Sequence, residues 1–126
     1  MAIPAKLQNE IKQFQRLQQE LAVLEQQRMQ LDMKLRETLS TLEELKNVPE
    51  GAAIYRPVGG LLVKASGKKE VEDNLSEEKE TLEVRVKGHE RNLAHLRERL
   101  QSMQKELTVA LQAAGVAVDS GGEDAS

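Results

Sequence analysis

The sequence has no cysteine, and only 2% of its 126 residues are aromatic. Without cysteine there is no disulfide framework and no thiolate zinc site, a usage typical of a cytoplasmic protein. The scarcity of aromatic residues argues against a rounded hydrophobic core. Leu, Gln, Glu, Lys and Arg dominate instead, which is the composition of long helices and coiled coils.

The sequence also lacks long apolar runs and an excess of basic charge. The chain turns polar directly after Met1–Pro4, so we expect neither a signal peptide nor a membrane span. Residues 5–46 carry seven basic and seven acidic side chains, and residues 67–114 carry nine and ten. Because neither stretch is basic overall, we expect no binding of nucleic acid.

Residues for catalysis or for metal binding are missing as well. The two histidines, His89 and His95, are six positions apart, which does not place them on one helical face. The glycines before Lys68 lack the spacing and the hydroxyl of a phosphate-binding loop. The carboxylates alternate with bases in a way typical of solvated helix faces. We therefore expect no enzyme activity, no cofactor and no metal site.

Two long heptad repeats are what the sequence does contain. In residues 5–46 nine of the twelve a and d positions are apolar, and in residues 69–114 ten of thirteen are. Each repeat predicts a helix that supercoils against a partner helix. Pro4 suits a helix start, and Pro49 marks the end of the first helix because a proline disfavours helix before it.

The two repeats match each other if the helices pack antiparallel with paired residue numbers summing to 117, since every a position then meets a d position. The apolar pairs are Leu7 with Ala110, Phe14 with Met103, Leu17 with Leu100, Leu21 with Leu96, Leu24 with Leu93, Leu31 with Val86, Leu35 with Leu82 and Leu42 with Leu75. The same register places Arg28 opposite His89 and Thr38 opposite Lys79, and such polar layers can fix a register.

Between the helices, residues 53–65 are predicted to form a β-hairpin. Two β-branched and apolar runs flank a Gly-Gly pair, and both glycines can adopt the positive φ that a two-residue turn requires. A lone hairpin is marginal in water, and its edges carry unpaired backbone groups. We therefore expect other chains to supply further strands. The residues assigned to this oligomerisation hairpin are Ile54, Tyr55, Val58, Gly59, Gly60, Leu61, Leu62 and Val63.

The free end of the predicted coiled coil carries more apolar residues than a two-helix seam can cover. These residues are Ile3, Leu7, Ile11, Phe14, Val109, Leu111 and Val116. Our hypothesis is that this tip binds apolar segments of other proteins. The alternative is that the residues only complete the seam, and for Leu7 and Phe14, at position a, both interpretations stay open. Residues 115–126, rich in Gly, Ser and acids, are predicted to be a disordered acidic tail.

The order of helix, hairpin and helix, with the sequences of residues 17–21, 54–64 and 79–87, resembles the beta subunits of archaeal prefoldin. The hairpin motif Tyr-x-x-Val-Gly-Gly-x-Leu-Val is the most specific part of the resemblance. The resemblance covers residues 3 to about 112. Gly88 inside the second helix and the long Gly-rich tail depart from the family pattern.

The expected fold is mainly α: a single prefoldin-like domain over residues 1–114, built as a long antiparallel two-helix coiled coil with the hairpin at the helix connection. The resemblance implies that hairpins assemble into an intersubunit β-barrel platform, in a hexamer of two alpha and four beta subunits. It also implies an ATP-independent holdase that captures unfolded proteins with coiled-coil tips and transfers them to a group II chaperonin. The alternative is a structural coiled-coil adaptor without chaperone activity.

Overall fold

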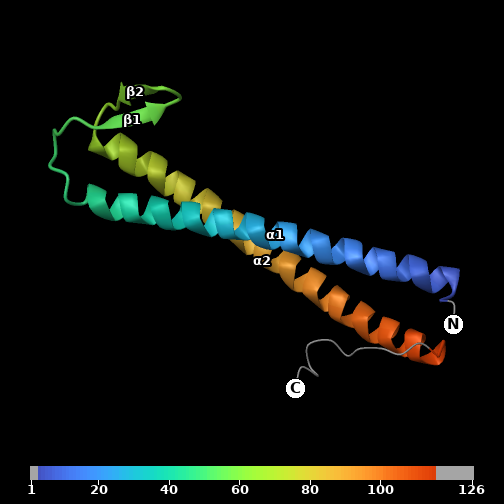
Figure 1. The fold of residues 1–126 in the computed structure, drawn as a ribbon. Coiled ribbons are helices and arrows are strands. Elements are labelled where there is room, and N and C mark those ends of the chain that lie inside the picture. Colours follow the sequence, from blue (N-terminus) through green and yellow to red (C-terminus); the bar gives the residue numbers. More distant parts are fainter. Residues whose placement is uncertain (1–2, 116–126) are drawn as a thin grey trace, which may run out of the picture. The chain divides into compact units, whose positions relative to one another are not determined.

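A computed structural model of the chain describes residues 3–115 (Figure 1). Its elements follow one another as α1 (Ala5–Leu45), β1 (Tyr55–Val58), β2 (Leu61–Lys64) and α2 (Lys68–Ala113). The predicted fold class is confirmed, because two long helices flank a small antiparallel hairpin. Each helix ends one residue earlier than the heptad pattern indicates, at Leu45 and Ala113. Of the predicted acidic tail, all but Gly115 lies outside the described residues.

The contacts within the chain divide it into two compact units, which are described separately here. Among the described residues, unit 1 comprises residues 3–26 and 91–115, and unit 2 comprises residues 27–90. Both helices therefore contribute residues to each unit, whereas the hairpin belongs to unit 2 alone.

The core of unit 1 is a seam of leucines from both helices. Its buried cluster is formed by Leu17, Leu96 and Leu100, and the partly buried residues packed against it are Phe14, Leu21, Leu24 and Met103. Leu93 is the most completely buried large side chain in the described chain, with 1% of its surface exposed. Each buried leucine contributes about 1.5 to 3 kcal/mol relative to an exposed one, so the seam stabilises itself.

The core of unit 2 is also formed by apolar side chains from both helices. Leu31, Leu82 and Val86 form its buried cluster, and Leu35 packs against it. Thr38 is also buried, with 4% of its surface exposed, but it does not depend on Lys79 for a partner. Its hydroxyl donates a hydrogen bond of 2.9 Å to the backbone carbonyl of Lys34, one turn earlier in α1. Thr38 therefore satisfies its polar group within its own helix.

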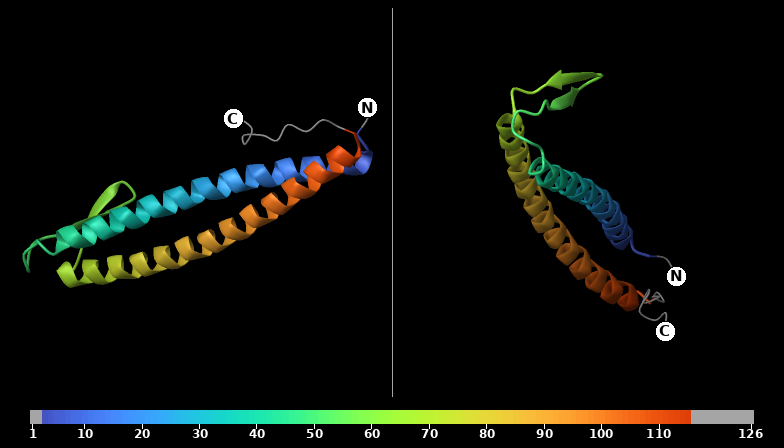
Figure 2. Two further views of the ribbon diagram at one scale, coloured as in Figure 1. Left: turned by 90° about the horizontal axis from the view of Figure 1, so that it is seen from below. Right: turned by 90° about the vertical axis from the view of Figure 1, so that its left-hand side faces the viewer.

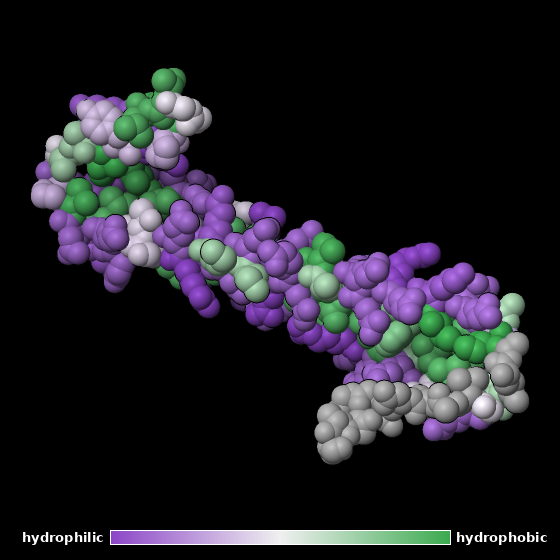
Figure 3. All heavy atoms as spheres, viewed as in Figure 1, coloured by the Kyte–Doolittle hydropathy of each residue, from purple (hydrophilic) through white to green (hydrophobic). Residues whose placement is uncertain are grey.

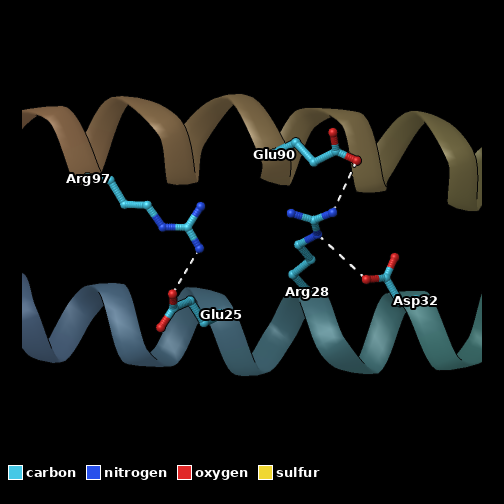
Figure 4. Close-up of polar contacts among 5 residues, drawn as sticks. All are labelled: Glu25, Arg28, Asp32, Glu90 and Arg97. Carbon is cyan, nitrogen blue, oxygen red and sulfur yellow. Dashed lines mark hydrogen bonds and ion pairs between the residues drawn. The ribbon is translucent and has the colours of Figure 1, made fainter.

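Charged side chains of both helices form ion pairs beside the leucine seams (Figure 4). In unit 2, Arg28 contacts Asp32 at 3.6 Å and Glu90 at 3.4 Å, while His89 Nε2 lies 3.4 Å from Gln27 Oε1. The heptad register places Arg28 opposite His89. Instead of staying in the seam, the long Arg28 side chain extends to the carboxylates of Asp32 and Glu90, where its charge remains hydrated.

Unit 1 has its own interhelical ion pair. Arg97 Nη2 donates to Glu25 Oε2 at 2.9 Å, and about half of each side chain is exposed, 51% and 47%. Exposed ion pairs of this kind contribute little to stability. Burial of the leucines therefore provides most of the stabilisation of unit 1.

The hairpin is a two-stranded antiparallel sheet. Tyr55 pairs with Lys64 and Val58 with Leu61, so the turn consists of Gly59 and Gly60. Of these two glycines, only Gly59 has a positive φ, of 61°, although both are able to adopt one. A positive φ at the first central residue alone is the pattern of a type II′ turn, whose twist matches that of the strands.

Two contacts fasten the base of the hairpin to the start of α2. The Lys68 ammonium donates a 2.9 Å hydrogen bond to the Val48 carbonyl in the segment that precedes β1. The Ser66 hydroxyl and backbone N–H both donate to the Glu70 carboxylate. These two hydrogen bonds from Ser66, the side-chain bond first, lower the pKa of Glu70 because they favour its charged form.

The turn geometry predicts that the two glycines differ in their tolerance of substitution. Gly59→Ala forces an L-residue into a positive φ, which costs about 1 to 2 kcal/mol. Gly60→Ala avoids this strain, because Gly60 has no positive φ and a Cβ there meets nothing within 4 Å. Amide hydrogen exchange in residues 56–63 should therefore accelerate about 5- to 30-fold in Gly59→Ala only. Equal acceleration in both variants would contradict the turn assignment.

The lowered pKa of Glu70 predicts an acid-sensitive start of α2. A carboxyl group whose pKa is lower in the folded chain contributes stability above its ordinary pKa and loses it as the pH falls through the lowered value. Glu70→Gln should therefore flatten the acidic part of a plot of unfolding free energy against pH. Glu80→Gln is the matched control, because Glu80 makes no side-chain hydrogen bond or ion pair with the described residues. Parallel curves for wild type and Glu70→Gln would refute the role of this contact.

Candidate functional site

Within residues 3–115, no group of three or more His, Cys, Asp or Glu side chains is placed to hold a metal ion. None of the helices there is long and apolar enough to cross a membrane. The residues that the sequence predicts to be functional lie on two surfaces, the hairpin and the tip.

The hairpin exposes apolar side chains on both of its faces. Strand side chains alternate, so the register puts one set on each face. One face carries Arg56, Val58, Leu61 and Val63, and the other carries Tyr55, Pro57, Leu62 and Lys64. Leu61 and Leu62 are 70% and 72% exposed, the highest fractions among the large apolar residues of the described chain. Neither face is therefore covered by the chain itself.

The surroundings of the hairpin agree with this exposure. Figure 2 shows that the turn projects clear of the adjoining helix ends, and Figure 3 shows apolar atoms gathered over the hairpin and at its base. Tyr55, Val58 and Val63 are exposed, Gly59 and Gly60 lie at the exposed turn, and only Ile54 is half-buried. The predicted oligomerisation residues thus form one continuous surface at the hairpin.

An apolar groove lies in unit 2 between β1 and the helix ends. Its volume is about 370 Å³, and its apolar walls are Leu45, Val48, Ile54, Tyr55, Pro57, Val71 and Leu75. Three polar side chains, Thr41, Glu44 and Arg56, complete the lining. No β2 residue lines it.

The groove is a feature that the sequence patterns did not reveal. Leu45 and Leu75 look like ordinary seam residues in a heptad repeat, and whether they face a partner helix or a groove depends on the tilt of the hairpin. Val48 and Val71 were the available signal, because both are apolar residues outside the a and d positions beside the predicted hairpin.

The six predicted tip residues that the structure describes belong to unit 1, but they differ in burial. Leu7 is buried, with 6% of its surface exposed, and Phe14 packs against the leucine cluster. This placement favours the seam interpretation for both residues. Ile3, Ile11 and Leu111 are half-buried, and Val109 is 65% exposed. Val116 lies outside the described residues.

Comparisons with known proteins agree with this arrangement. Residues 8–114 match the family of prefoldin subunits. The prefoldin beta subunit of Archaeoglobus fulgidus is 41% identical over 105 residues, which cover 83% of this chain and 90% of that protein. The prefoldin beta subunit of Thermococcus onnurineus is 37% identical over 110 residues, covering 87% and 94%.

A solved structure shows the same fold. The crystal structure of the prefoldin beta subunit from Thermococcus strain KS-1 superposes with a TM-score of 0.77 at 34% identity, and the match covers 87% of this chain and 96% of that one. The helix-hairpin-helix order, the family match and the identity to these relatives lead to one conclusion: the chain belongs to the prefoldin subunit family, alongside the archaeal beta subunits.

Proposed function

We propose that the chain is a beta-type subunit of a cytoplasmic, ATP-independent chaperone that holds unfolded proteins and transfers them to a group II chaperonin. The observation that carries the proposal is that the helices bury their apolar side chains and the hairpin does not. Unit 1 and unit 2 each pack a leucine core, whereas the hairpin leaves apolar side chains uncovered on both faces. The hairpin is thus suited to assembly, and the helices are suited to act as arms.

The hairpins would join in an intersubunit β-barrel platform. A two-stranded sheet has two open edges, and closure into a barrel with strands of other subunits removes them. The subunits would be two alpha chains and four copies of this chain, as the family resemblance implies. Apolar residues on one face of each hairpin would then fill the barrel interior.

Client binding is assigned to the tip residues that the seam does not bury. Unfolded chains expose apolar segments of no fixed sequence, so a holdase needs apolar patches without a shape-specific pocket. Ile3, Ile11, Val109 and Leu111 retain exposed surface in unit 1 and supply such a patch. Several arms acting together raise the effective concentration of each weak contact, which strengthens binding without any new contact.

The tip assignment predicts a loss of client binding when its residues become polar. Ile3→Ser, Ile11→Ser and Leu111→Ser are combined in one variant, which should bind an unfolded client at least about 10-fold more weakly because three apolar contacts are lost. The measurement is suppression of client aggregation by the assembled complex at increasing concentration, together with the affinity of a fluorescent client.

A matched variant controls for the loss of exposed apolar surface in general. Val23→Ser, Met33→Ser and Val84→Ser change three residues that are 55%, 61% and 69% exposed but lie away from the helix ends. This control should suppress aggregation as well as the wild type. If the tip variant remains fully assembled and fully active, the tip assignment is wrong; if neither the wild type nor any variant suppresses aggregation, the adaptor interpretation replaces the chaperone function.

A further inference from the structure

We propose that a pocket in unit 2, lined by hydrogen-bond donors of both helices, binds a small anion that carries two phosphate groups, such as inorganic diphosphate. The pocket includes none of the hairpin or tip residues, and the proposal does not depend on the chaperone function. It rests on two cations without anionic partners, on a lining made of donors, and on an open edge beside a glycine.

The pocket lies between α1 and α2 and has a volume of about 370 Å³. Five of its six described lining residues have side chains that can donate hydrogen bonds, and none of the six is a carboxylate, although 21 residues of the chain are Asp or Glu. Since a water molecule takes up about 30 Å³ in the liquid, the pocket has room for a group several times larger than water. The lining residues are Gln27, Gln30, Leu31, Lys34, Arg85 and His89.

Two of the lining side chains are cations without an anionic partner. Lys34 of α1 and Arg85 of α2 are exposed, and neither forms an ion pair with another residue of the described range 3–115. The sequence explains this for Arg85, because the positions three and four residues away on α2 hold no carboxylate. Those positions are occupied by Thr81, Leu82, Gly88 and His89. Both charges are therefore available to an anion from solution.

Two carboxylates near these lining residues in the sequence are directed toward a different cation. Asp32 and Glu90 face Arg28, at 3.6 Å and 3.4 Å (Figure 4). Neither of them lines the pocket. The ion pairs with Arg28 thus keep these two negative charges from competing with an anion for Lys34 and Arg85.

An anion in the pocket would be held from both helices. The guanidinium of Arg85 is a planar fork of donors that fits two phosphate oxygens, and Lys34 adds an ammonium from the other helix. Gln27 turns its Oε1 toward His89 Nε2, at 3.4 Å, so the Gln27 amide nitrogen remains a donor. The lining contains no Phe, Tyr or Trp on which a nucleobase could stack. The phosphate groups are therefore the part of a ligand that this pocket recognises.

Gly88 keeps one edge of this site open. It lies within α2 three residues after Arg85, and a Cβ added there would meet nothing within 4 Å. Residues three apart are neighbours on a helix surface, so a long side chain at position 88 would lie beside the Arg85 guanidinium. The missing side chain leaves Arg85 accessible, which gives a physical reason for a residue that otherwise disfavours helix.

Isothermal titration calorimetry of the full chain with inorganic diphosphate, at constant ionic strength in chloride, tests the site. Two charged hydrogen bonds of ordinary strength correspond to a dissociation constant of about 1 mM or lower. Loss of one cation in Lys34→Gln or Arg85→Gln should weaken binding about 10-fold. Lys87→Gln is the matched control, because it removes the same charge from α2 but does not line the pocket, and it should leave the affinity unchanged.

Two results of this titration would overturn the proposal. One is the absence of diphosphate binding by the wild type at about 10 mM, which is weaker than two charged hydrogen bonds provide. The other is equal weakening by Arg85→Gln and Lys87→Gln, which would show that the anion is attracted only by the general charge of the helix. Far-UV circular dichroism establishes that each variant retains its helices.

Substitutions of Gly88 test the placement of the anion by a second route. Gly88→Glu puts a carboxylate beside Arg85 and should weaken diphosphate binding at least about 10-fold, because the new side chain competes for the guanidinium. Gly88→Ala adds no charge and favours helix, so it should retain the wild-type affinity. Wild-type affinity in Gly88→Glu would contradict the assignment of the anion to this pocket.

Two further ligands determine what the pocket recognises. Adenosine diphosphate should bind as tightly as inorganic diphosphate, because only the phosphate groups are held. A tetraglutamate peptide should bind at least about 10-fold more weakly, since its carboxylates are spread along a chain and cannot all enter the pocket. Tighter binding of adenosine diphosphate would reveal recognition of the nucleoside, and tighter binding of the peptide would assign the pocket to an acidic protein segment; either result refutes the proposed ligand class.

Discussion

The structure depends on one constraint: a two-stranded sheet with apolar side chains on both faces cannot be covered by the chain that forms it. Leu61 and Leu62 leave 70% and 72% of their surfaces exposed, on opposite faces of the hairpin. The described chain offers no third strand to pair with either edge. The hairpin is therefore the part of the chain that we propose other subunits complete.

The helices have the opposite character. Their leucines are buried within each unit, and Leu93 in unit 1 leaves only 1% of its surface exposed. The interhelical ion pairs of Arg28 and Arg97 are partly hydrated and add little energy, although they can favour one register over another. The proposed client binding therefore uses the apolar surface that this packing leaves exposed.

The heptad repeats and the turn residues were enough to predict the fold. Spacing of Leu17, Leu31 and Leu100 in the sequence indicated which residues face the seam, and the structure buries all three. The turn was predicted from its glycines, but sequence alone could not show that Gly59 and not Gly60 takes the positive φ, because both residues permit it.

Contacts made by long or polar side chains were less accessible to sequence reasoning. Arg28 can reach several carboxylates from one backbone position, so its pairing with Glu90 required coordinates. Thr38 can bond to its own helix or across the seam, and the geometry selects the Lys34 carbonyl. The groove depends on the tilt of the hairpin against the helix ends, a tertiary feature that no local pattern encodes.

The most direct test of the account is the native mass of the chain, measured alone and after co-expression with an archaeal prefoldin alpha subunit. The account predicts a complex that contains four copies of this chain and two of the alpha subunit, because the hairpin must be completed by other subunits. A chain that ignores the alpha subunit and remains a monomer or a simple dimer would contradict it.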